Sequence, residues 1–308
     1  MSPPTLRNLT VAEIMLRAYR RHILIPAFNI AYLPMVQPII AALESLRSFA
    51  LLEVARPDLE RFGATSYQAV AEEFHSCADL AYARLHQDHV PVIDEEGRPV
   101  DWRPLIEQAL ALGYHSVMID ASRLPLADNI AVTKAVVALA HPAAAVEAEL
   151  GAVLGHEPGP LPPYEELFQS GRGFTDPQEA AQLVNETALD WLSVAVGNIH
   201  GAIIGAARDE QKVQARLHLQ HLRGISQRLP IPLVLHGGTG IDLPCLLAAA
   251  QNGIAKINVG TALRQPYEAA LRSGETTQSA QQAVARVAGQ LLHDYCIVGS
   301  ADTLASAP

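Results

Sequence analysis

Short apolar runs alternate with longer, helix-like segments along almost the whole chain. The apolar runs predict eight strands, at residues 23–28, 50–55, 82–86, 116–120, 144–150, 191–196, 232–236 and 255–259. Segments with helical periodicity lie between them, at residues 35–43, 67–81, 103–112, 128–140, 177–187, 211–228 and 243–252. Near-continuous apolar strands are typical of a parallel sheet that is covered on both faces.

Eight strands that alternate with helices predict a closed (β/α)8 TIM barrel of the α/β class. We expect residues 1–308 to form this barrel as a single domain. An open doubly wound sheet is the alternative, but no GxGxxG motif follows the first strand. The small and polar residues from about 299 onward predict a flexible tail.

Composition and charge narrow the possible partners. The chain has 32 acidic and 22 basic residues and a formal net charge of −10, which argues against nucleic-acid binding. Residues 23–43 are uncharged and long enough to span a bilayer, but three prolines and a change of pattern favour a strand followed by a helix. The three widely spaced cysteines imply neither a disulfide framework nor a thiolate zinc site. We therefore expect a cytoplasmic protein with no membrane partner.

Polar residues follow or end most of the predicted strands. They are Asn29, His86, Asp88, His89, Asp120, Glu147, Glu149, His200, His236 and Asn258. Because the carboxyl ends of barrel strands meet at one rim, these side chains should gather there. Three of them, His89, His200 and His236, match a catalytic zinc site with three imidazole ligands and one open position. Each histidine alone is more often an ordinary structural residue, and only the set of three favours a metal.

Glycine-rich turns follow the last two predicted strands. Loops at these positions of a barrel commonly bind phosphate through backbone N–H groups and helix N-termini, although turns need glycine for other reasons too. The candidate phosphate-binding residues are Gly237, Gly238, Thr239, Asn258, Gly260 and Thr261.

Two features around the fifth strand have open interpretations. Glu147 and Glu149 lie in an apolar strand, so they need a second cation or a salt bridge to an arginine such as Arg123. The following segment, residues 154–174, is rich in glycine and proline. It is either a lid that carries Glu157 or a plain surface excursion.

From about Pro26 to Thr261 the chain resembles the class II, zinc-dependent ketose-bisphosphate aldolases, which include fructose- and tagatose-bisphosphate aldolases. The order and spacing of the matching motifs are highly specific. The motifs are PAFNI, HQDH, SVMIDAS, DNIAVTK, VEAELG, FTDPQEA, GNIHG, PLVLHGGTGI and KINVGT.

The resemblance implies a reaction and a role for each matching residue. A phosphorylated ketose, such as fructose or tagatose 1,6-bisphosphate, would be cleaved reversibly to dihydroxyacetone phosphate and an aldehyde, as in glycolysis. Asp88 and Glu157 would transfer protons, and the three histidines would bind Zn²⁺. Asp120 and Glu149 match an alternative metal position, which allows a second divalent or monovalent cation. Positions that match substrate or phosphate contacts are Asn29, Gly201, Gly237, Gly238, Thr239, Asn258 and Thr261. We also expect a homodimer or a homotetramer.

Several positions depart from the family pattern around the substrate. Ala55 replaces the usual serine or threonine, Ile203 lies where a tyrosine or basic residue is common, and Gly260 replaces an aspartate. Residues 90–99 add a short loop after the third strand. These changes favour, as an alternative, an aldolase for another sugar phosphate. A catalytically weak paralogue that binds a sugar phosphate or metal as a regulator is a further alternative. An imine aldolase that uses Lys256 is disfavoured, because this lysine matches the ordinary KINV position.

Overall fold

The computed structural model describes residues 5–152, 164–198 and 215–306, and its eight strands close into a barrel in sequence order. All neighbouring strands are parallel, and the first strand closes the ring by pairing with the eighth. The strands are β1 (Ile25–Asn29), β2 (Ala50–Val54), β3 (Ala83–Pro91), β4 (Ser116–Asp120), β5 (Ala145–Leu150), β6 (Trp191–Val194), β7 (Leu233–Leu235) and β8 (Ile254–Val259). This architecture confirms the predicted (β/α)8 TIM barrel.

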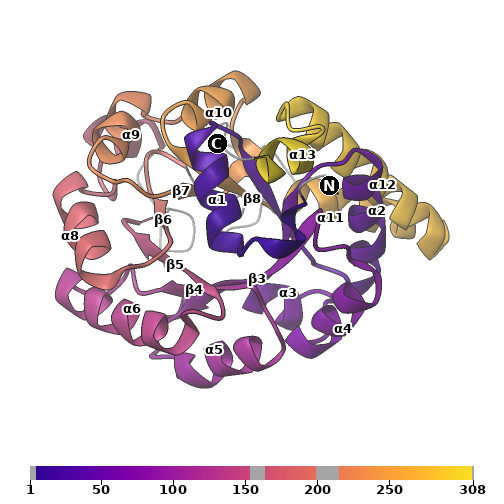
Figure 1. The fold of residues 1–308 in the computed structure, drawn as a ribbon, viewed down its shortest axis with the longest axis horizontal. Helices are drawn as coiled ribbons and strands as arrows, with labels where there is room; N and C mark the ends of the chain where they lie inside the picture. Colours follow the sequence, from indigo (N-terminus) through magenta and orange to yellow (C-terminus); the bar gives the residue numbers. More distant parts are fainter. Residues whose placement is uncertain (1–4, 153–163, 199–214, 307–308) are drawn as a thin grey trace.

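Helices surround the barrel and cover the outer face of its strands (Figure 1). The main outer helices are α2 (Val36–Ser45), α4 (Tyr67–Cys77), α5 (Trp102–Ala111), α6 (Leu126–Ala140), α8 (Pro177–Thr187), α9 (Leu219–Ser226), α10 (Leu243–Ala250), α11 (Thr261–Arg272) and α12 (Thr277–Asp294). Shorter helices are α3 (Arg56–Glu60) and α7 (Tyr164–Ser170), with 3-10 turns η1 (Leu6–Asn8), η2 (Leu33–Met35) and η3 (Gly238–Gly240). No helix in the described ranges is long and apolar enough to cross a membrane.

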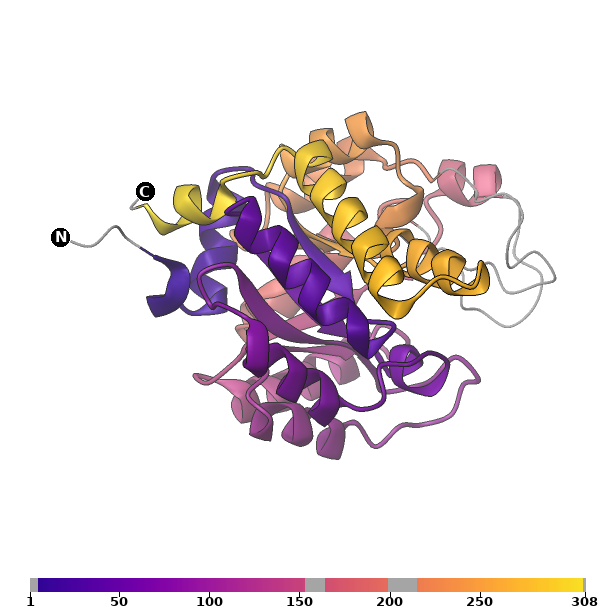
Figure 2. The same cartoon turned by 90° about the vertical axis from the view of Figure 1, so that its right-hand side faces the viewer.

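The amino-terminal end of the barrel is closed by α1 (Val11–Arg20) and α13 (Ser300–Ala305), which lie together at one end of the molecule (Figure 2). Ile14 and Met15 of α1 and Leu304 of α13 are fully buried, in one cluster with residues of β1, β2 and β6. Arg17 donates from Nη1 to the carbonyl oxygen of Leu304 at 2.8 Å. The predicted flexible tail is therefore wrong from residue 300 to 305, because burial of apolar side chains offsets the cost of ordering this segment.

Strand β3 is longer than its sequence pattern predicts, and it contains a bulge. Gln87 pairs with Val117 and Val90 pairs with Ile119, so one extra residue is accommodated on β3 between these pairs. His89 lies at the bulge with a φ of 41°, in the left-handed region. A bulge re-aims side chains and is common beside functional sites. Asp88 and His89 therefore belong to the strand itself and do not follow it in a loop.

The added loop after β3 forms a tight turn. Ile93 and Pro99 form an antiparallel bridge, and Asp94 accepts hydrogen bonds from the backbone N–H groups of Glu96 and Arg98. Arg123 donates to the carbonyl oxygen of Asp94 at 2.7 Å. This turn lies beyond the carboxyl end of β3, on the same side of the barrel as the polar strand ends.

Candidate metal centre

Asp88, His89 and His236 come together at the carboxyl ends of β3 and β7. His89 Nε2 lies 2.7 Å from His236 Nδ1, and the donor atoms of the three residues lie within 4.8 Å of one another. Asp88 accepts a hydrogen bond from Asn258 Nδ2 at 2.9 Å, and Asn198 Nδ2 donates to the His236 carbonyl oxygen at 3.2 Å. The bulge and the closed barrel thus bring residues separated by 147 positions into contact.

A second group of possible ligands shares His89. Its Nδ1 lies 3.6 Å from Asp120 Oδ2, and Glu149 completes the group. Glu149 Oε2 also lies 3.3 Å from His236 Nδ1 and accepts a hydrogen bond from Ser193 Oγ at 3.3 Å. The two groups are therefore adjacent positions within one continuous site.

Burial and mutual charge shift the pKa values of the groups in this site. Burial lowers the pKa of His89, but Asp88, Asp120 and Glu149 outweigh it and raise this pKa to about 10. Burial, reinforced by the nearby Asp120, raises the pKa of Glu149 to about 8. For Asp88, burial acts upward, but His89 and His236 hold its pKa below the usual value. Neighbouring carboxylates raise the pKa of both His89 and Glu149, and such a concentration of negative charge in a buried region favours a bound cation.

The donor set fits zinc. Imidazole nitrogens with carboxylate oxygens are ligands that Zn²⁺ takes in catalytic sites. Two of the three predicted histidine ligands, His89 and His236, are close enough to share an ion, and Asp120 and Glu149 lie beside them. His200, Gly201 and Glu157 lie outside the described residues.

The predicted phosphate-binding loops meet at the same rim. Gly237 adopts a left-handed conformation, with φ 72° and ψ 25°. A Cβ on Gly238 would lie 2.4 Å from the side chain of Ile257, so only glycine fits where η3 approaches β8. A Cβ on Gly260 would lie 3.2 Å from Asn29 Oδ1, which places the end of β1 beside the start of α11 at Thr261. The backbone of Thr239 lies in η3, and its side chain lies outside the described part of the structure.

Sequence reasoning missed a charged layer that lies inside the barrel next to this site. Glu53, Glu147 and Lys256 are fully buried, and Lys256 Nζ lies 2.9 Å from Glu147 Oε2 and 3.3 Å from Glu53 Oε2. The proposed salt bridge from Arg123 to the strand-five glutamates is wrong, because Arg123 bonds the Asp94 backbone and Lys256 pairs with Glu147. The signal was present in the sequence, since Glu53 and Lys256 are single charges within apolar strands.

The charged layer fixes the protonation of its own members. Burial acts upward on the pKa of Glu147, but Lys256 and His236 bring it well below the usual range. Burial and the neighbouring Asp88 raise the pKa of Glu53 well above its usual value. Burial lowers the pKa of Lys256, yet Glu147 and Glu53 outweigh it and the pKa rises. An ionised Lys256–Glu147 pair beside a protonated Glu53 follows from these directions.

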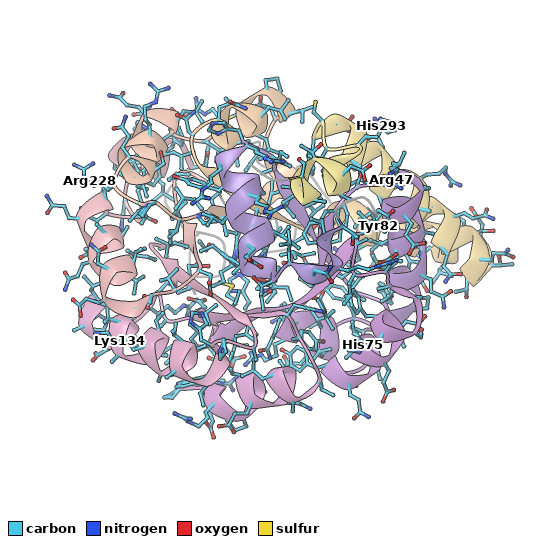
Figure 3. All side chains as sticks on the ribbon, viewed as in Figure 1. Arg47, His75, Tyr82, Lys134, Arg228 and His293 are labelled. Atoms are coloured by element: carbon cyan, nitrogen blue, oxygen red, sulfur yellow. The ribbon has the colours of Figure 1, made fainter. Side chains whose placement is uncertain are left out.

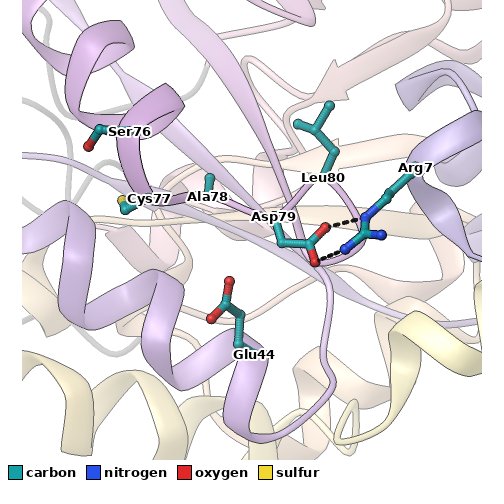
Figure 4. A pocket seen from close by; sticks show the side chains of 7 residues that line it. All are labelled: Arg7, Glu44, Ser76, Cys77, Ala78, Asp79 and Leu80. Atoms are coloured by element: carbon teal, nitrogen blue, oxygen red, sulfur yellow. Dashed lines mark hydrogen bonds and ion pairs between the residues drawn. The ribbon is translucent and has the colours of Figure 1, made fainter.

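Several other histidine and charged side chains lie away from the carboxyl ends of the strands. His75 and His293 are exposed on outer helices, and Lys134 on α6 pairs with Glu186 (Figure 3). A surface hollow of about 470 Å³ lies near Arg7 and Asp79, which form an ion pair just before β3 begins (Figure 4). Because this hollow is at the amino-terminal end of β3, it is separate from the candidate metal centre.

Comparison with known proteins identifies relatives over most of the chain. A family model described as fructose-bisphosphate aldolase class-II matches residues 9–303. The 6-phospho-5-dehydro-2-deoxy-D-gluconate aldolase of Halalkalibacterium halodurans is 32% identical over 270 residues, which cover 86% of this chain and 84% of that protein. The D-tagatose-1,6-bisphosphate aldolase subunit GatY of Klebsiella oxytoca is 30% identical over 263 residues, which cover 84% of each chain.

The fold is similar to that of a solved aldolase. The crystal structure of the YdjI aldolase from Escherichia coli K12 matches with a TM-score of 0.74 and 25% identity, over 94% of this chain and 98% of that one. The chain therefore belongs to the class II fructose-bisphosphate aldolase family, a family of aldehyde-lyases.

Proposed function

We propose that this protein catalyses the zinc-dependent, reversible aldol cleavage of a phosphorylated ketose to dihydroxyacetone phosphate and an aldehyde. The observation that carries the proposal is the cluster of Asp88, His89 and His236 at the carboxyl ends of the barrel strands. His200, outside the described residues, would be the third histidine ligand. Asp120 and Glu149 would hold the ion at an alternative position, with room for a second cation.

Cleavage beside a ketone leaves negative charge on the substrate, and a bound zinc ion would supply Lewis acidity there. Asp88 would take the proton of the C4 hydroxyl during cleavage and return it during condensation. Its lowered pKa keeps it ionised and able to accept that proton. Glu157, outside the described residues, would move the proton at the dihydroxyacetone-phosphate carbon.

The remaining candidate residues would bind the substrate. Backbone N–H groups of Gly237, Gly238 and Gly260, with the amino terminus of α11, would hold a phosphate group. Thr239, Thr261 and Gly201 would contribute to the same subsite. Asn29 and Asn258 would contact substrate hydroxyl groups, and the buried Oδ1 of Asn258 has no hydrogen-bond partner among the described residues.

A ketose 1,6-bisphosphate is the substrate that we propose first, because the tagatose-bisphosphate relative covers most of the chain. A different sugar phosphate is the second candidate. The relative at 32% identity is named for 6-phospho-5-dehydro-2-deoxy-D-gluconate, and Ala55 removes a hydroxyl group at the end of β2. The turn at residues 93–99 also adds side chains at this rim.

A substrate screen tests the proposal. The purified protein should be assayed against fructose 1,6-bisphosphate, tagatose 1,6-bisphosphate and 6-phospho-5-dehydro-2-deoxy-D-gluconate, with and without zinc. We expect cleavage of at least one of them, only in the presence of metal. The reaction should release dihydroxyacetone phosphate if a bisphosphate is cleaved. Binding of a sugar phosphate without any turnover would instead support the regulatory alternative.

A further inference from the structure

The mechanism above makes no use of the charged layer inside the barrel, formed by Glu53, Glu147 and Lys256. All three side chains are fully enclosed, and Trp191, also fully buried, closes the layer against β6. Replacing a buried ion pair by apolar residues is often neutral or stabilising, so stability alone does not explain these charges. These charges are explained if they orient side chains of the neighbouring candidate metal centre.

The two oxygens of Glu147 have different partners. Oε2 accepts hydrogen bonds from Lys256 Nζ at 2.9 Å and from Trp191 Nε1 at 2.6 Å. Oε1 lies 2.9 Å from His236 Nε2. Two donors on one side hold the carboxylate in place, and its second oxygen is directed at the imidazole of a proposed zinc ligand.

The Lys256 ammonium group and the Trp191 N–H both donate to Glu147, so this carboxylate is ionised and can only accept hydrogen bonds. His236 Nε2 must therefore carry a proton, because otherwise two lone pairs would face each other at 2.9 Å. In a neutral imidazole, the other nitrogen then offers its lone pair. That nitrogen, Nδ1, is the one that lies 2.7 Å from His89 Nε2, within the candidate metal centre.

We propose that Glu147 is a positioning residue that fixes the tautomer and orientation of His236, and that Lys256 and Trp191 hold Glu147 for this task. The proposal rests on the metal centre inferred above, but not on the identity of the substrate. Groups that bond the far nitrogen of a ligand histidine set its tautomer and basicity in metal proteins generally. Lys256 thus acts through Glu147 and does not need to touch the substrate.

The variant Glu147→Gln should reverse this arrangement. Lys256 and Trp191 both donate, so they should select the carbonyl oxygen of the new amide. The NH₂ group would then face His236 Nε2 and act as a donor. His236 would have to accept at Nε2 and carry its proton on Nδ1, where the proton competes with a metal ion.

Glu53→Gln is the matched control. Glu53 lies in the same buried layer and 3.3 Å from Lys256 Nζ, and the replacement has the same size, although a protonated Glu53 loses no negative charge in it. Among the described contacts of Glu53, none is a hydrogen bond to His236. We expect this variant to leave both the tautomer of His236 and its metal affinity unchanged.

The test combines two measurements on the full-length protein. Long-range ¹H–¹⁵N NMR of metal-free, histidine-labelled protein reports which nitrogen of His236 is protonated, with the signal assigned through His236→Gln. Competition with a chromophoric chelator gives the affinity for zinc. We expect Nε2–H in the wild type and in Glu53→Gln. In Glu147→Gln we expect Nδ1–H and zinc binding that is weaker by roughly 10- to 100-fold.

A wild-type His236 with its proton on Nδ1 would overturn the proposal, even if Glu147→Gln does not fold. So would a folded Glu147→Gln variant with an unchanged tautomer and unchanged zinc affinity. The NMR measurement uses neither metal nor substrate. If the protein cleaved no ketose phosphate, the proposed function would be refuted, but this inference about His236 would still stand.

Discussion

Asp88 is buried, and its surroundings favour the ionised carboxylate. Asn258 orients it, and the two neighbouring histidines lower its pKa. We expect Asp88→Asn to lower kcat by roughly 10²- to 10⁴-fold, the usual contribution of a general acid–base group. Steady-state kinetics on the substrate found in the screen would measure this effect.

Zinc content is the control for Asp88→Asn, since Asp88 lies beside the proposed ligands. Metal analysis should show that the variant retains its zinc. A variant with full zinc and near-normal turnover would show that another group carries the C4 hydroxyl proton.

The ionisation of Asp58 on α3 should affect the stability of the folded protein. It accepts hydrogen bonds from the Ala55 backbone N–H at 2.9 Å and from Asn29 Nδ2 at 3.4 Å. Burial raises its pKa to about 6 from a usual 3.8, although the bond from Ala55 opposes the change. The folded state therefore binds this proton more tightly than the unfolded state, so stability falls as the pH rises from about 4 to about 6.

Asp58→Asn should remove this dependence. A shift of about two pKa units corresponds to at most roughly 3 kcal/mol. Relative to the wild type, the variant should gain Tm at pH 7.5 and show little gain at pH 4.5. Thermal unfolding of both proteins at the two pH values measures the difference. An equal difference at both pH values would contradict the raised pKa.

At the scale of elements, the short helix α13 acts as part of the barrel core. Leu304 is fully buried against α1, whereas Leu271 on α11 is 39% exposed. Leu304→Ala should lower the free energy of unfolding by roughly 2–5 kcal/mol, as for other buried leucines. Leu271→Ala is the matched control and should change it by about 0.5 kcal/mol or less. Denaturant unfolding of both variants measures this, and equal losses would show that α13 does not seal the barrel.

Element prediction from the sequence succeeded where the signal was local. All eight strands were predicted, and the bounds of β4 match the prediction at both ends. The extension of β3 was missed, because its apolar pattern is interrupted by the polar run from His86 to His89. That run lies on a strand only because β4 pairs with it on both sides of the bulge.

At the scale of the whole molecule, we expect activity to depend on a metal held across the barrel. Chelation should abolish cleavage, and zinc should restore it. Zinc at about 100 times its Kd should also stabilise the folded state by about 2.7 kcal/mol, because the ligands come together only on folding. Differential scanning fluorimetry of metal-free protein with added zinc would record the rise in Tm. Full activity in a sample verified to lack metal would contradict this view.

The same architecture predicts that Lys256 forms no imine. Its side chain is fully buried and paired with Glu147 and Glu53, so it is charged and out of reach of a ketone. Borohydride treatment in the presence of substrate, followed by mass spectrometry, should therefore leave Lys256 unmodified. A substrate-derived adduct on this lysine would restore the imine mechanism.

The sequence by itself determined the eight strands and most of the helices between them, the polar residues at the strand ends and the family motifs. These are properties of neighbouring residues, which periodicity and spacing record directly. Only the tertiary structure decided the bulge that turns Asp88 and His89 into the site, the burial of α13, and the pairing of Glu147 with Lys256 across 109 positions. Those features depend on contacts between distant segments, and a partner for a buried charge is chosen by the closed barrel and not by the residues next to it in the chain.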